Sequence, residues 1–138
     1  MFVALLDGSP MPERGADPLG DDPAGAYQKS AAALQDAVGR PGVLERSYPG
    51  PFGKAAGAEL LQLRVADLLT HGWDLAQATG VSARLPDDLA EQALAFVREH
   101  LSTQPRTGRF DEPQPIDDTA TAIERLAAFS GRRVRPEL

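Results

Sequence analysis

The stretch from Gly57 to Thr79 is the longest uninterrupted helical pattern in the chain. At about 1.5 Å per residue it would extend over roughly 35 Å, which is the length of a small helical bundle. Its apolar side chains occur on more than one side of the helix, which predicts that the helix is buried. The residues expected to be buried are Leu61, Val65, Leu68, Leu69 and Trp73.

Four polar residues form one narrow stripe on this helix. Arg64, Asp67, His71 and Asp74 follow one another at spacings of three, four and three residues, which places them on one side. A buried charge is costly unless it is paired, hydrogen-bonded or bound to a metal. One explanation is a divalent cation bound jointly by Asp67 and His71, one helical turn apart. The other is a set of side-chain ion pairs and hydrogen bonds without a metal.

Composition limits the chemistry that the chain can perform. Its 138 residues fit one globular domain over residues 1–138, and its formal charge of −6 argues against a nucleic-acid partner. The only basic cluster, Arg132, Arg133 and Arg135, is short and terminal. The absence of cysteine excludes disulfides and thiolate metal sites and fits a cytoplasmic protein. No apolar run approaches the ~20 residues of a membrane span, so we expect no membrane partner.

Shorter helices are predicted on both sides of the long one. Their expected ranges are residues 1–6, 23–39, 86–101 and a last helix that begins at Asp117 or Asp118 and ends at Gly131. Residues 41–56 contain too much proline and glycine for a helix and predict a hairpin-like crossover that turns at Pro49 and Gly50. His100 lies in the last turn of its helix, where it is either a further metal ligand or a residue favoured by the helix dipole.

Several segments together resemble one known family. They are FVALLDG near the start, DPAGAYQKSAAAL, the PFG turn at residues 51–53, LLQLRVADLLTHGWDLAQATG and RLAAFSGRR. The most specific part is the pattern from Asp67 through His71, Gly72, Trp73 and Asp74 to Ala76. The sequence resembles the actinobacterial metal-binding proteins of the DinB/YfiT-like superfamily. It is most similar to the branch related to the N-terminal domain of mycothiol-dependent maleylpyruvate isomerase.

This resemblance implies an all-α fold, a four-helix bundle with a short extended crossover, that holds a divalent ion such as zinc or nickel. Asp67 and His71 match two of the family's three metal ligands. The third is a histidine that precedes the segment resembling FVALLDG, and this sequence begins after that position. We therefore expect a bundle that is truncated at its N-terminus. Arg64, Trp73 and Asp74 are expected to contact a cofactor or substrate beside the metal.

Two functions follow from these expectations. The resemblance implies a thiol-dependent metalloenzyme, such as a mycothiol-dependent isomerase or S-transferase, acting on a small molecule. The alternative is a non-catalytic ligand-binding or regulatory module in which the polar stripe is structural. A truncated bundle would also expose apolar surface, which predicts a homodimer with Phe2, Leu5 and Leu6 at or near the contact.

Overall fold

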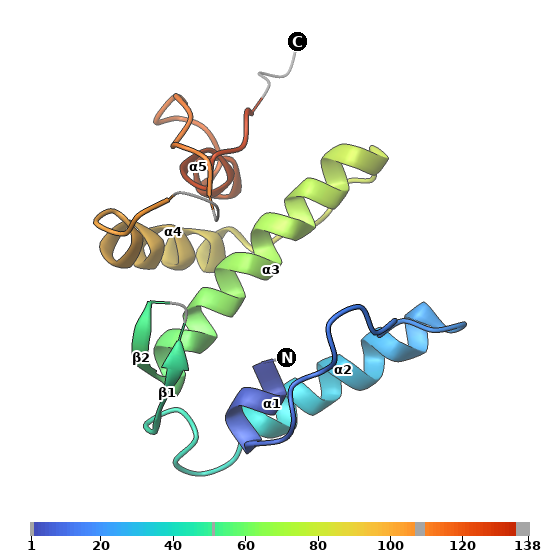
Figure 1. The fold of residues 1–138 in the computed structure, drawn as a ribbon. Helices are drawn as coiled ribbons and strands as arrows, with labels where there is room; N and C mark the ends of the chain where they lie inside the picture. The colour runs from blue at the N-terminus through green and yellow to red at the C-terminus, as the bar shows by residue number, and fades with distance from the viewer. Residues whose placement is uncertain (1, 51, 107–109, 135–138) are drawn as a thin grey trace. The chain divides into compact units, whose positions relative to one another are not determined.

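Two compact units make up the chain, Met1–Leu60 and Leu61–Leu138. The computed structural model describes residues 2–50, 52–106 and 110–134 of the sequence. Figure 1 follows the chain from α1 in blue to α5 in red. The expectations that fell on Met1, Pro51 and Arg135 lie outside the described residues. The prediction of a single domain over residues 1–138 stays a prediction, and the two units are described separately below.

The first unit contains two helices that pack together, α1 (Phe2–Asp7) and α2 (Pro23–Val38). The Asp22 carboxylate caps α2 by accepting a hydrogen bond of 3.0 Å from the Gly25 backbone N–H. Pro23 fits the first turn because its missing N–H would have no partner there. These features confirm the predicted start of the helix, and Gly39 at its C-cap confirms the predicted end. Leu6 is buried inside this unit, whereas Leu5 is half-buried, and the predicted dimer contact stays a prediction.

A β-hairpin follows α2 in the first unit. Strands β1 (Ser47–Gly50) and β2 (Gly53–Ala56) pair antiparallel, with Tyr48 opposite Ala55. The predicted hairpin is confirmed, but its turn lies beyond Gly50 instead of at Pro49 and Gly50. Gly53, the first residue of β2, adopts a φ of 112°, a conformation that glycine reaches at little cost and other residues rarely adopt.

The prediction of an all-α four-helix bundle is wrong. The described residues form five helices and a two-stranded antiparallel sheet, which is a mixed architecture. The strands at residues 47–50 and 53–56 pair with each other, so the chain is not built from helices alone. In addition, α1 has 6 residues and α5 has 8, so neither matches the 23 residues of α3 as a bundle helix would.

The second unit is built from the larger part of α3 (Gly57–Thr79), from α4 (Asp87–Leu101) and from α5 (Ala122–Phe129). The sequence predicted the bounds of α3 and α4 closely. One apolar core joins the three helices, and Leu94 of α4 and Leu126 of α5 are its largest fully buried side chains. The other buried members are Ala66, Leu69, Ala90, Ala93, Val97, Leu101 and Ala122.

Only one side of α3 is buried, which corrects the expectation of a helix covered all round. Leu69 is buried, as predicted, but Leu61, Val65 and Trp73 are only half-buried. Leu68 is 54% exposed, because the core packs on the side of α3 that carries Ala66 and Leu69. Among the described helices, α3 included, none is long and apolar enough to cross a membrane.

The last helix, α5, begins later than predicted. Its N-cap is Thr121 and not Asp117 or Asp118. The Thr121 hydroxyl accepts from the Glu124 backbone N–H, while the Glu124 carboxylate accepts from the Thr121 N–H at 2.9 Å. This reciprocal capping box satisfies two backbone donors, which a single aspartate would not do. Asp117 instead accepts hydrogen bonds from the backbone and hydroxyl of Thr119.

Arg106 fixes the segment that precedes α5 against the end of that helix. Its guanidinium donates to the carbonyls of Asp111 at 3.0 Å and Phe129 at 2.9 Å. It also lies over the Phe129 ring, 4.6 Å from the ring centroid, where a cation is attracted to the π face. Phe110, next to Asp111, and Ser130, next to Phe129, both line the pocket described below.

Candidate metal and ligand site

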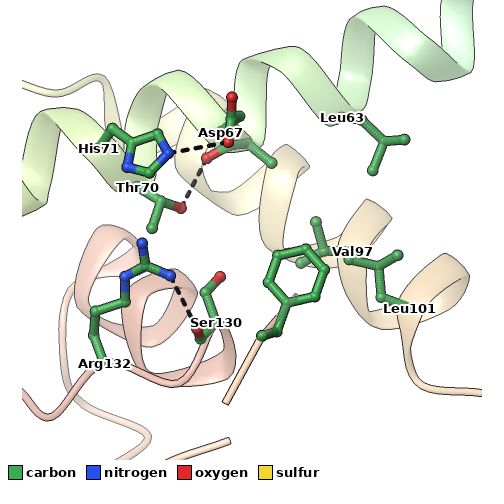
Figure 2. A pocket seen from close by; sticks show the side chains of 10 residues that line it. Leu63, Asp67, Thr70, His71, Val97, Leu101, Ser130 and Arg132 are labelled. Atoms are coloured by element: carbon green, nitrogen blue, oxygen red, sulfur yellow. Dashed lines mark hydrogen bonds and ion pairs between the residues drawn. The ribbon is translucent and has the colours of Figure 1, made fainter. Parts of the chain in front are cut away.

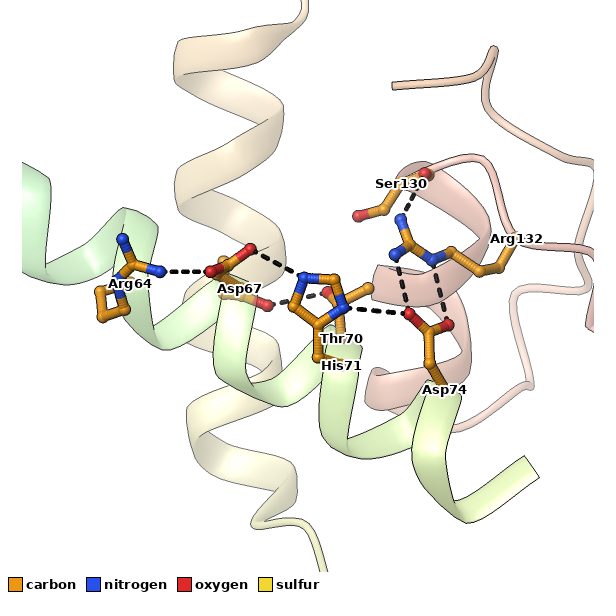
Figure 3. A network of polar contacts seen from close by, with 8 residues as sticks. Arg64, Asp67, Thr70, His71, Asp74, Ser130 and Arg132 are labelled. Carbon is orange, nitrogen blue, oxygen red and sulfur yellow. Dashed lines mark hydrogen bonds and ion pairs between the residues drawn. The ribbon is translucent and has the colours of Figure 1, made fainter. Parts of the chain in front are cut away.

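The polar stripe of α3 forms a continuous chain of ion pairs and hydrogen bonds within the second unit (Figure 3). Arg64 donates to Asp67 at 2.5 Å, and Asp67 lies 3.2 Å from one ring nitrogen of His71. The other ring nitrogen lies 3.2 Å from Asp74, which pairs in turn with Arg132. The prediction that the stripe residues share one side and meet one another is confirmed.

The stripe is not deeply buried, which corrects the expectation that its charges lie in the interior. The side chain of Asp67 is 44% exposed and that of His71 is 63% exposed. Ionised side chains at this level of exposure keep much of their hydration, so burial does not by itself demand a metal. The positions of the donor atoms therefore decide whether a metal can bind here.

The donor atoms of Asp67 and His71 have the separation that a shared ion requires. Asp67 Oδ1 lies 3.2 Å from His71 Nε2. Zinc bonds of about 2.0 to 2.2 Å place two ligand atoms roughly 3.0 to 3.5 Å apart, depending on the bond angle. In the described part of the chain, however, no group of three or more His, Asp or Glu side chains surrounds a common point. Asp67 and His71 therefore offer an ion two protein donors, one fewer than the three of a catalytic zinc site.

Asp74 gives His71 the orientation that metal-binding histidines commonly have. Its Oδ2 lies 3.2 Å from His71 Nδ1, so an N–H at Nδ1 can donate to this carboxylate. Nε2 then carries a lone pair that faces Asp67. A carboxylate behind the ring is the usual partner of a metal-bound imidazole. An N–H at Nε2 could equally donate to Asp67 Oδ1, since either ring nitrogen of an imidazole can carry a proton.

Arg132 holds Asp74 in this position from the C-terminal side of α5. Its Nε and Nη2 donate to the two carboxylate oxygens at 3.1 and 2.8 Å, a bidentate pair that spans 58 residues of sequence. Nη1 donates to the Ser130 carbonyl at 3.0 Å. The hydrogen bond from Arg132 is the main reason that the pKa of Asp74 lies below its usual value, and burial opposes this only in part. The same hydrogen bond raises the pKa of Arg132.

The pair predicts a defined loss of stability in acid. Because the folded pKa of Asp74 is lower than its unfolded value of about 4, its contribution is fully present above that value. The contribution disappears as the pH falls through the lowered folded pKa. Asp74→Asn is therefore expected to lower stability at neutral pH and to reduce its dependence on pH below about 4. Urea unfolding in EDTA at several pH values measures this.

The control for that experiment is a double-mutant cycle with Arg132→Gln. The coupling energy between the two substitutions is expected to shrink as the pH is lowered, because a protonated Asp74 no longer forms an ion pair. A coupling energy that stays constant between neutral and acidic pH would contradict the pairing.

A pocket of 160 Å³ lies beside the network (Figure 2). Its polar lining comes from Asp67, Thr70, His71, Ser130 and Arg132, and its apolar lining from Leu63, Ala66, Val97, Leu101 and Phe110. Figure 2 shows His71, Thr70, Ser130 and Arg132 gathered at one end, with Leu63, Val97 and Leu101 at the other. The pocket is therefore suited to a small ligand with one polar and one apolar end.

The predicted site residues divide into two groups with respect to this pocket. Asp67 and His71 line it, whereas Arg64, Trp73 and Asp74 are absent from its lining. Arg64 contacts the lining residue Asp67, and Asp74 contacts the lining residue His71. Their predicted contacts with a cofactor stay predictions, as does that of Trp73. His100 stacks on Phe96, with ring centroids 4.1 Å apart, bonds to the Phe96 carbonyl and does not line the pocket.

Sequence reasoning missed Arg132, Ser130 and Phe110 as parts of the site. In the sequence, Arg132 stands out only as a member of a short basic cluster. Helical spacing on α3 cannot reveal a partner 58 residues away. The stripe did contain a signal that a basic partner lies elsewhere in the chain. It has two aspartates and only one arginine, so one carboxylate has no oppositely charged partner on the helix.

Two proteins of Mycobacterium tuberculosis are similar to this chain in sequence. They carry the names Uncharacterized protein MT0763 and Uncharacterized protein Rv0738, come from two strains, and are each 38% identical over 112 residues. The matched region covers 80% of this chain. No family model matches the sequence, and no solved structure matches it. The chain spans 62% of the length of these curated relatives.

Proposed function

We propose that the second unit binds a divalent metal ion through Asp67 and His71. The observation that carries the proposal is the position of His71 between two carboxylates. One ring nitrogen lies 3.2 Å from Asp67 Oδ1, the other 3.2 Å from Asp74 Oδ2. Asp74, anchored by Arg132, is a positioning residue that orients the ring. Arg64 neutralises the second oxygen of Asp67, which weakens the attraction of this carboxylate for a cation.

A metal at this position would border the pocket, and we propose that its remaining coordination positions face a small molecule there. An ion such as zinc or nickel supplies Lewis acidity to a coordinated water, thiol or carbonyl group. The resemblance to mycothiol-dependent proteins makes a thiol such as mycothiol our candidate cofactor, with an isomerase or S-transferase reaction. The similarity to mycobacterial proteins supports an actinobacterial setting for this proposal. The lack of cysteine supports a cytoplasmic location.

Metal titration of the purified protein tests the proposal. After treatment with EDTA and its removal, calorimetry with zinc and with nickel is expected to show one ion per chain. Asp67→Asn and His71→Ala each remove one of two protein ligands and are expected to abolish detectable binding. Asp74→Asn leaves both ligands in place but removes the support of the ring, so affinity is expected to fall about 10- to 100-fold.

His100→Ala is the matched control, because His100 is the second of only two histidines and lies outside the pocket. Its affinity for zinc is expected to equal that of the unaltered protein. Equal binding by the His71→Ala protein, or no binding by the unaltered protein at millimolar zinc, would rule out the site.

One observation favours the alternative of a non-catalytic binding module. Arg64, Asp67, Asp74 and Arg132 form two oppositely charged pairs, so the network is electrically balanced without a metal. A protein that folds fully in EDTA, binds no zinc and retains its pocket would support this alternative. Self-association also stays a proposal, and light scattering at several protein concentrations would test it.

A further inference from the structure

The polar end of the pocket contains hydrogen-bond donors that the network does not use. Arg132 has five N–H groups, of which three donate to Asp74 and the Ser130 carbonyl. Within the described part of the chain, the other two have no acceptor, and the Ser130 hydroxyl makes no hydrogen bond. Arg132 and Ser130 both line the pocket. A ligand with an acceptor group would therefore find a cationic donor and a hydroxyl next to each other.

The opposite end of the pocket offers only apolar contacts. Val97 and Leu101 are buried in α4, Leu63 and Phe110 are half-buried, and all four line the cavity. The volume of 160 Å³ is close to the roughly 150 Å³ of an engineered apolar cavity that accommodates benzene. The pocket as a whole is thus large enough for an apolar group of about six carbon atoms.

The N–H groups left free on Arg132 suit an anionic group better than an organic cation. Asp67 is the acidic side chain in the lining, and both of its oxygens already have neighbours. One accepts from Arg64, and the other faces His71. An ammonium group would meet Arg132 and compete with Arg64 for Asp67. A carboxylate would instead accept from Arg132 in the charge-assisted geometry that guanidinium groups prefer.

From these observations we propose that the pocket binds small organic acids, with the carboxylate at Arg132 and Ser130 and an apolar body of benzene size between Leu63, Val97, Leu101 and Phe110. The site shares Asp67 and His71 with the proposed metal site, but its anion-binding groups come from the C-terminal side of α5. Binding therefore does not require the metal. Benzoate has the size and charge of such a ligand, and benzamide is its uncharged counterpart.

The experiment is a titration of the ¹⁵N-labelled full chain with benzoate in EDTA, followed by NMR. Saturable binding with a dissociation constant on the order of 1 mM or tighter is expected for a ligand of this size. The largest shifts are expected at the backbone amides of Phe110, Ser130 and Arg132. Benzamide is expected to bind about tenfold more weakly, because it lacks the charge that strengthens a hydrogen bond to arginine.

Three variants locate the anion. Arg132→Gln is expected to weaken benzoate binding about tenfold or more, and Ser130→Ala severalfold. Arg133→Gln is the matched control, since it makes the same charge change at the next residue, which is exposed and outside the pocket lining. It is expected to bind benzoate normally. Because Arg132 also anchors Asp74, Arg132→Gln could unfold the protein, so the melting temperature of each variant is measured. If Arg132→Gln unfolds, the loss of benzoate binding in Ser130→Ala is the test of the anion position.

Several results would overturn the proposal. They are the absence of saturation by benzoate, equal affinity for benzamide, and equal losses in the Arg132→Gln and Arg133→Gln proteins. Benzoate binding that appears only after zinc is added would also contradict it, while leaving the proposed metal site intact. Conversely, benzoate binding in EDTA by a protein that binds no zinc would support the acid site and remove the metal site.

Discussion

Leu94→Ala is expected to lower the free energy of unfolding of the second unit by about 2 to 5 kcal/mol. Leu94 is 1% exposed and lies in the core between α3, α4 and α5. Truncation removes apolar contacts and leaves a cavity that neighbouring helices can close only in part. Chemical unfolding followed by far-UV circular dichroism measures the change. Since the chain has two units, the unfolding curve is first checked for more than one transition.

Leu89→Ala provides the matched control for this substitution. Leu89 lies on the same helix, five residues earlier, and is 40% exposed. The same change of side chain is expected to cost about 1 kcal/mol or less there, because less apolar surface is removed from the interior. Equal costs at both positions would mean that α4 does not present Leu94 to a packed core.

Gly57→Ala is expected to destabilise the first unit by about 1 to 3 kcal/mol or more, although alanine is the better helix former. A Cβ atom at this position would lie 2.3 Å from the Val43 carbonyl oxygen and 3.0 Å from Leu44 Cα. Backbone atoms cannot move away easily here. The Gly57 N–H donates to the Arg46 carbonyl and the Ala58 N–H to the Leu44 carbonyl, both at 2.9 Å. Relief of the clash would break these bonds.

Gly72→Ala tests the same change within the same helix, where the surroundings are different. A Cβ atom there would lie 3.2 Å from Leu85 Cδ2, the mobile end of a side chain that can shift. The gain in helix propensity, up to about 1 kcal/mol, is expected to offset much of this crowding. Thermal unfolding of both variants measures the difference. A Gly57→Ala protein as stable as Gly72→Ala would show that the start of α3 is not packed against residues 43 and 44.

The two proposed ligand sites make different demands on the same network. The metal site needs Asp67 and His71 on α3, with Asp74 behind the ring. The acid site needs Arg132 and Ser130, which follow α5. Arg132 contributes to both, because one edge of its guanidinium holds Asp74 while further N–H groups remain available. Substitutions at Arg132 should therefore affect both ligands, whereas Ser130→Ala should affect the acid alone.

Local sequence signals determined those parts of the protein that depend on neighbouring residues. Asp22 with Pro23 set the start of α2, because a cap acts within one turn. At the start of α4 no side chain caps the helix, but Pro86 and the acidic Asp87 and Asp88 of the first turn are equally local signals. Spacings of three and four residues brought Arg64, Asp67, His71 and Asp74 together for the same reason. For α5 a local signal was also present, the capping box at Thr121, but the sequence-based prediction placed the start of the helix at Asp117 or Asp118.

Only the tertiary structure decided which side of α3 is covered and what completes the site. Apolar residues occur around most of α3, so the sequence alone could not show that Leu69 would be buried and Leu68 exposed. That choice depends on the direction from which α4 and α5 pack. The bidentate contact of Arg132 with Asp74 and the pocket between Leu63, Val97 and Ser130 likewise join residues far apart in sequence. Such contacts follow from the packing of the three helices, and no local pattern encodes them.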